Sequence, residues 1–168
     1  NIYRSDTMKR FFTYESPYRT EIFMKLNKAE YILPLLILLV LVFFIIFYKD
    51  LLKKDDQREK MIRYSVGVVF TIVYLSHYIL RFSIYGFDTL ILPFQLCSIS
   101  MFVAIILIFT KNRTLYSFVL YTGVAGGLIS LFVPVIGYDS TYYRYYQYYG
   151  AHIILIATPI YFMAVHDY

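Results

Sequence analysis

The chain has 168 residues, of which 60% are hydrophobic and only 16% are charged. A soluble domain carries roughly a quarter charged residues, so this composition excludes an ordinary water-soluble fold. The apolar residues also lie in blocks of about 20, the length that crosses a hydrocarbon core of roughly 30 Å. We therefore expect an all-α, polytopic integral membrane helical bundle of about five transmembrane helices.

The charges and the cysteine content restrict the kinds of site that we expect. The formal net charge is +5, but the bases form no groove interleaved with stacking aromatic side chains, so no nucleic-acid partner is predicted. Cys97 is the single cysteine, and one thiol supplies neither an internal disulfide nor a cysteine metal cluster. We expect no metal and no cofactor. The twenty tyrosines gather near the ends of the apolar blocks, as in an interfacial aromatic belt.

The chain order indicates a short leading segment and one transmembrane domain. Residues 1–28 mix aromatic and basic side chains around Pro17, which is typical of an interfacial, juxtamembrane segment that breaks at the proline. No cleavable signal peptide is evident there, so we expect the spans themselves to direct insertion. Residues 29–168 form a single domain without internal repeats. Its first span, about 31–48, has no polar side chain inside and is predicted to be a mainly lipid-facing anchor.

The connector that follows the first span, residues 49–63, carries charges of both signs. Asp56 and Lys60 stand four residues apart, as do Glu59 and Arg63, and opposite charges at this spacing meet on one face of a helix. The connector is therefore predicted to be a short solvated helix.

The second span, about 64–85, carries polar side chains in its last three turns. Tyr74, His77, Tyr78 and Arg81 fall within about 100° of one another around a helix axis. Because polar side chains are costly in hydrocarbon, this face should look into the bundle or into water.

The third and fourth spans differ in the residues they offer. The third, about 90–109, has Gln95 and Cys97 in its first half. The fourth, about 115–136, carries small residues and a proline at roughly four-residue spacing, a pattern that lets another backbone approach closely. These are Gly123, Gly127, Ser130 and Pro134. Tight helix packing without any chemistry is a sufficient explanation for the glycines.

The fifth span, about 149–165, has His152 in its first turn. Alternation of the spans defines two membrane faces. We call face A the one shared by the N-terminus and the loops after the second and fourth spans, and face B the one shared by the other two loops. The polar candidates all fall near face A: His77, Arg81, Gln95, Cys97 and His152.

Cys97 is the candidate nucleophile of this layer. It lies about seven residues into its predicted span, roughly 10 Å below face A, near the depth of a lipid ester bond. A cysteine attacks as the thiolate and needs a neighbouring base, for which His77 and His152 are both at a compatible depth. A free cysteine is also commonly buried as a small hydrophobe. The residues therefore leave a catalytic and a structural role open.

The sequence LPFQLCS at residues 92–98 resembles the LPLxLC-type motif that opens a span in the YwaF family of bacterial multispanning membrane proteins. The resemblance covers about residues 85–165 and includes a glycine-rich span ending at a proline, followed by a histidine: Gly123, Gly126, Gly127, Pro134 and His152. That family is similar to the eukaryotic TMEM-type cysteine acyltransferases, which move fatty acyl chains between phospholipids. The resemblance implies Cys97 as the acyl-accepting nucleophile, His152 as the general base and the bacterial plasma membrane as the location.

Three functions are open on this basis. The first is a lipid-modifying acyltransferase acting on membrane phospholipids, with His77, Arg81 and Gln95 as substrate-binding residues. The second is a non-enzymatic subunit or scaffold that packs against other membrane subunits through the small residues and the polar face. The third is a component of a transporter or channel, with the polar layer as the permeation site.

The distribution of bases gives two conflicting indications of orientation. Between the spans, face B holds eight Lys and Arg residues and face A holds one, so the positive-inside rule predicts a cytoplasmic face B. Residues 1–28 add six bases on face A, which favours the opposite orientation.

Overall fold

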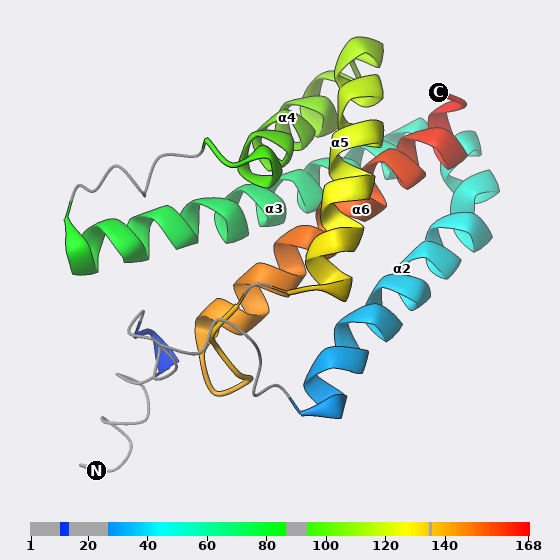
Figure 1. The fold of residues 1–168 in the computed structure, drawn as a ribbon. Helices are drawn as coiled ribbons and strands as arrows, with labels where there is room; N and C mark the ends of the chain where they lie inside the picture. Colours follow the sequence, from blue (N-terminus) through cyan, green and yellow to red (C-terminus); the bar gives the residue numbers. More distant parts are fainter. Residues whose placement is uncertain (1–10, 14–26, 87–93, 135) are drawn as a thin grey trace, which may run out of the picture.

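The computed structural model describes residues 11–13, 27–86, 94–134 and 136–168 (Figure 1). The long helices are α2 (Lys28–Lys54), α3 (Asp56–Tyr85), α4 (Leu96–Thr110), α5 (Arg113–Phe132) and α6 (Tyr143–His166). The described ranges contain no strand, and the all-α prediction is confirmed. Four of these helices, α2, α3, α5 and α6, are long and apolar enough to cross a membrane. The fifth, α4, has 15 described residues.

Side chains that accept hydrogen bonds from free backbone amides fix where the helices begin. Asn27 and Glu30 form a reciprocal capping box at the start of α2, which satisfies amides that have no partner inside the helix. Asp55 ends α2 and starts α3, where its carboxylate accepts from the amide of Arg58. Asn112 caps α5 in the same way. The single residue between α2 and α3 makes these two helices a tight hairpin.

The helices alternate in direction, as the two-face description requires. At face A, the hydroxyl of Tyr31 near the start of α2 donates to the carbonyl of Phe132 at the end of α5, at 2.6 Å. At face B, Lys53 near the end of α2 pairs with Asp167 beyond the end of α6, at 2.7 Å. The helices α2 and α3 diverge from Asp55 with α6 between them (Figure 1). Helix α6 contacts the other four long helices and is the most buried of the candidate spans.

Small residues bring α5 and α6 together, as the sequence predicts. A Cβ atom on Gly127 would lie 2.6 Å from Cγ1 of Ile156, and one on Gly123 would lie 3.1 Å from the side chain of Leu155. A methyl group at Gly127 would require Ile156 to move, and one at Gly123 would make a tight contact with Leu155. Because α6 already covers them, Gly123 and Gly127 do not offer a surface to another subunit, contrary to the role they have in the subunit hypothesis.

The charged connector differs from its prediction. It is not a separate solvated helix, because α3 starts at Asp56 and continues through the connector into the second span. Arg63 donates to Glu59 at 2.7 Å, as the four-residue spacing predicts. However, Glu59 is 2% exposed and Arg63 is 5% exposed. Hydrogen-bond donors from other parts of the bundle cover Glu59. The charges near Glu59 in the sequence therefore could not predict its burial.

The tyrosines at the start of α6 also depart from the predicted aromatic belt. Tyr142, Tyr145 and Tyr149 are buried, and hydroxyl groups in this region bond to other helices. Tyr145, for example, donates to the carbonyl of Glu30 in α2 at 2.5 Å. A run of aromatic residues near a membrane interface suits a lipid-facing belt and an inward-facing contact equally well, because the composition is the same in both.

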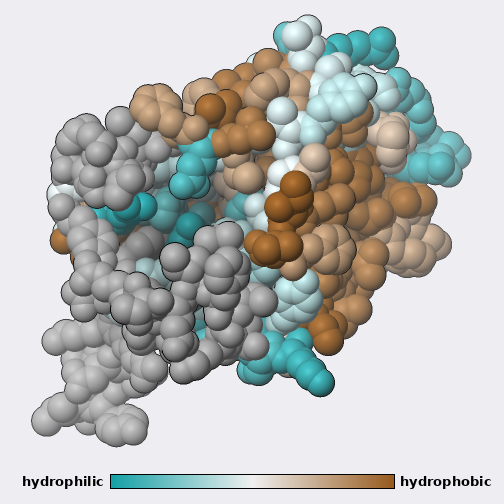
Figure 2. Space-filling model, in the orientation of Figure 1, coloured by the Kyte–Doolittle hydropathy of each residue, from teal (hydrophilic) through white to brown (hydrophobic). Residues whose placement is uncertain are grey.

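The outer surface of the bundle is strongly apolar. Helix α2 exposes a series of large hydrophobic side chains, among them Leu39 and Phe47, which agrees with the lipid-facing anchor expected for the first span. Figure 2 shows a broad hydrophobic surface with hydrophilic residues gathered towards its edges. Most of the predicted interfacial segment 1–28 lies outside the described residues. Within it, the rings of Phe11 and Phe12 contact Tyr143 at the start of α6.

Candidate functional site

Cys97 lies in the first turn of α4, next to the end of α5. It is the second residue of the helix, so it is not seven residues inside a described helix as the sequence led us to expect; residues 87–93 are outside the description. The thiol is free and partly buried. Its Sγ lies 3.7 Å from Oγ of Ser130, and a Cβ on Gly126 would lie 3.4 Å from the sulfur. The glycine therefore leaves the space that the thiol occupies.

His152 is enclosed in the middle of the bundle. Helix α6 starts at Tyr143, so the histidine is nine residues from the helix start and not in the first turn. It is 5% exposed, and its Nδ1 lies 2.7 Å from the carbonyl oxygen of Tyr148. A carbonyl only accepts, so Nδ1 carries the proton and Nε2 of the neutral ring carries the lone pair. The backbone thus selects the tautomer in which Nε2 is the basic nitrogen.

Ser130 and Tyr148 connect the thiol to the imidazole. The hydroxyl of Tyr148 donates to the carbonyl of Ser130 at 3.1 Å, and the rings of Tyr148 and His152 are 4.4 Å apart. Among the hydrogen bonds of the described residues, none joins Cys97 directly to His152. Cys97 thus contacts Ser130 on α5, and Tyr148, one turn before His152 on α6, bonds to the same residue.

Helix α3 closes a second side of this region. Tyr74 is buried, as the sequence predicts for this face, and its hydroxyl donates to the carbonyl of Ser98, the residue after Cys97, at 3.1 Å. His77 and Arg81 lie about one and two turns further towards face A and are partly buried. Gln95 is exposed and precedes α4 without a side-chain capping bond. On the described chain, His77 and Arg81 thus follow Tyr74 towards face A, and Gln95 stands two residues before Cys97.

Polar contacts between α3 and α6 were not selected from the sequence. The hydroxyls of Ser76 and Tyr143 are 2.6 Å apart, and the amide of Gln147 donates to the carbonyl of Val73 at 3.4 Å. Gln147 also accepts from Arg144. Gln147 is a buried amide in a membrane helix. A polar side chain in such a helix indicates a contact inside the bundle, so the sequence did contain a signal for this residue.

A second polar cluster, which we call the Glu59 cluster, lies at the opposite end near face B. The two oxygens of the Glu59 carboxylate accept from four side chains on α3, α6 and the α4–α5 connection. These donors are Arg63 at 2.7 Å, Tyr161 at 2.9 Å, His166 at 2.9 Å and Lys111 at 3.2 Å. Arg63 also donates to the carbonyl of Ile108. Nothing in the described part of the chain groups three or more His, Cys, Asp or Glu side chains to hold a metal ion.

Comparison with known proteins identifies the family. Residues 23–168 match the TMEM164 family, and this range contains all five long helices and every candidate residue discussed above. No curated protein and no solved structure matches the chain. Together with its apolar helices, this match shows that the chain is an integral membrane protein that belongs to the TMEM164 family.

Proposed function

We propose that this protein transfers acyl chains between membrane phospholipids, with Cys97 as the nucleophile and His152 as the general base. The proposal follows the resemblance to the YwaF family and to the cysteine acyltransferases, and the bacterial plasma membrane stays a prediction of that resemblance. It concerns the candidate site near face A and assigns no chemistry to the Glu59 cluster.

One observation carries the proposal: contacts through Ser130 and Tyr148 link the free thiol of Cys97 to His152, whose tautomer is fixed. Cys97 lies in the first turn of α4, where the helix dipole favours negative charge. His152 presents Nε2 as its basic nitrogen because Nδ1 is bonded to the backbone of Tyr148. A thiol with a nearby base that a third group orients is the recurring arrangement of nucleophilic catalysis. Catalytic contacts are often longer in a free site than in the reacting complex, and the proposal requires that lipid binding bring Cys97 and His152 together.

The reaction then has two balanced halves. His152 takes the thiol proton, and the sulfur of Cys97 attacks the ester carbonyl of a phospholipid. The bond to the glycerol oxygen breaks, that oxygen receives the proton from His152, and a thioester and a lysophospholipid result. In the second half, His152 removes the proton from the hydroxyl of another lysophospholipid, which attacks the thioester. The departing sulfur recovers the proton, and no oxidant or other co-reactant is consumed.

The phosphate of the donor lipid is assigned to the face-A side of this site. Arg81 supplies a permanent positive charge, and His77 and Gln95 supply hydrogen-bond donors. These roles are part of the proposal and are tested separately from the nucleophile.

The test uses the full chain in vesicles that contain a phospholipid with a labelled acyl chain and an unlabelled lysophospholipid. Wild-type protein should move the label to the lysophospholipid and carry it as a hydroxylamine-sensitive thioester. Cys97→Ser should abolish both signals. His152→Gln should slow transfer by roughly 10²–10⁴-fold, the range for loss of a general base.

Two matched variants separate chemistry from folding. Ser130→Ala removes the hydroxyl beside the sulfur but no nucleophile, so it should retain the thioester. Arg81→Gln should raise the donor concentration needed for half-maximal transfer and leave the thioester chemistry intact. Transfer that survives in Cys97→Ser protein would refute the mechanism.

The subunit and transporter hypotheses give different outcomes. An obligate subunit should not migrate alone and monodisperse in mild detergent, and a transporter should show solute uptake in vesicles regardless of the Cys97 thiol. The glycines that suggested a subunit contact are covered by α6, so the structure adds no observation in favour of that hypothesis.

A further inference from the structure

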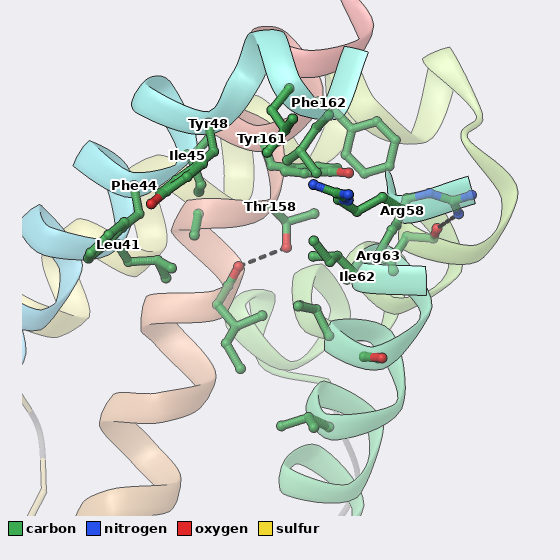
Figure 3. Close-up of a pocket in the computed structure, with 18 residues that line it drawn as sticks. Leu41, Phe44, Ile45, Tyr48, Arg58, Ile62, Arg63, Thr158, Tyr161 and Phe162 are labelled. Carbon is green, nitrogen blue, oxygen red and sulfur yellow. Dashed lines mark hydrogen bonds between the residues drawn. The ribbon is translucent and has the colours of Figure 1, made fainter. Parts of the chain in front are cut away.

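A cavity of about 510 Å³ lies between α2, α3 and α6 in the face-B half of the bundle. Figure 3 shows side chains from these helices around it. Leu41 and Tyr48 belong to α2, Ile62 to α3, and Thr158 and Phe162 to α6. Large apolar residues on its rim, including Tyr48 and Ile62, are exposed on the outer surface. The cavity is therefore a lateral pocket that opens towards lipid.

The depth of this pocket matches one leaflet. Along α2 it extends from Leu41 to Leu52, and along α3 from Arg58 to Val69. Each stretch is twelve residues, so its two ends are about 16 Å apart along the helix at 1.5 Å per residue. That is about half of a hydrocarbon core of roughly 30 Å. An extended acyl chain has the shape and the chemistry of this space, whereas a transmembrane helix needs the full thickness.

Charged side chains of both signs lie at the face-B end of the pocket. Arg58 lines the pocket there; its side chain is half-exposed and lies 3.3 Å from Asp55. Leu52 also lines a second cavity, of about 350 Å³, whose walls include Lys53 and Lys111. A lipid phosphate at the half-exposed guanidinium of Arg58 would gain charge-assisted hydrogen bonds. Acidic residues line the second cavity as well, so the surroundings suit a headgroup held at a mixed polar surface.

From the pocket's depth, its opening and the position of Arg58 at its face-B end, we propose that it binds one phospholipid of the face-B leaflet. One acyl chain occupies the apolar cavity, and the phosphate lies at Arg58. This site is at the opposite membrane face from Cys97, so the inference does not depend on the acyltransferase proposal. The bound lipid fills the opening of the α2–α3 hairpin beside α6, where the protein alone leaves a void.

Photolabelling in vesicles tests the site. The full chain is reconstituted in phosphatidylcholine vesicles that contain a small fraction of phosphatidylglycerol with a diazirine halfway along one acyl chain. After illumination, labelled residues are mapped by mass spectrometry. Labels should concentrate on the pocket-lining parts of α2, α3 and α6. Arg58→Gln should lower the yield several-fold with this probe but not with a diacylglycerol that carries the same diazirine chain.

Variants that fill the pocket provide the second measurement. Ala157→Phe places a ring in the cavity and should lower labelling several-fold. Val66→Phe does the same from the rim, where a larger side chain is tolerated, and replaces it if Ala157→Phe does not fold. Ile72→Phe adds the same ring on the lipid-facing surface of α3 outside the pocket and should leave labelling unchanged. Labels spread evenly over the outer surface, crosslinks to a second copy of the chain, or equal yields in all variants would overturn the proposal.

Discussion

Replacing Glu59 by glutamine should destabilise the bundle far more than the loss of one surface charge would. The substitution keeps the shape of the side chain but removes the negative charge that compensates Arg63, which is itself almost fully buried. Leaving one member of a buried ion pair without its partner costs about 3–5 kcal/mol. For a chain of this length, 1 kcal/mol corresponds to about 2–4 °C in Tm. The expected loss is therefore roughly 6–20 °C.

The assay is thermal unfolding in detergent, followed by the helix signal in circular dichroism. Asp167→Asn provides the control, because it breaks the exposed pair with Lys53, and exposed pairs contribute little. Its Tm should equal that of the wild type within error. The double variant Glu59→Met with Arg63→Met should recover much of the loss, since an apolar pair of similar volume often replaces a buried ion pair without cost. A Tm for Glu59→Gln within a degree of wild type would refute the reasoning.

Two further pairs of variants test the packing of α6. Gly127→Ala should lower the free energy of unfolding by about 1–3 kcal/mol, because the new methyl meets Ile156 and overpacking carries a cost of this size. Gly150→Ala, in the same bundle but with open space at its Cβ, should instead raise it by about 0.4–1 kcal/mol. Tyr149→Phe removes a buried hydroxyl that has no partner among the described residues and should be neutral or stabilising, whereas Tyr145→Phe should cost about 0.5–1.5 kcal/mol by deleting the bond to α2. Equal effects within either pair, measured by reversible unfolding, would contradict the assignment.

The parts of the fold that follow from hydrophobicity alone were predictable. Long apolar stretches predict the membrane-spanning helices, because in lipid the backbone N–H and C=O groups of each stretch must form hydrogen bonds with one another. The spacing of small residues in α5 predicted a close helix contact, because it is a local property of one helix. The structure shows that the partner is α6. The polar face of α3 was also readable, and Tyr74 is buried on it.

The errors arise where residues far apart in the chain decide the outcome. Glu59 is buried because Lys111 and His166 bond to it from other parts of the bundle. The residues next to Glu59 in the sequence do not predict these partners. Helix α6 starts at Tyr143, six residues before the predicted span, because its polar first turns are buried against α2 and α3. Because these residues are polar, a hydropathy pattern assigns them to a loop. The described helix that holds Cys97 begins at Leu96, whereas the predicted span began at about residue 90.

The central position of α6 has a consequence for how the bundle is assembled. Its contacts with α2 join residues more than 100 positions apart, such as Tyr145 and Glu30. During synthesis, α2 to α5 enter the membrane before the helix that joins them exists, so the growing chain carries unsatisfied polar groups in lipid until α6 arrives. The long-range contacts of α6 are then the last to form, and such contacts are slow to form. The period before α6 docks is when this chain is most exposed to misassembly or capture by quality control.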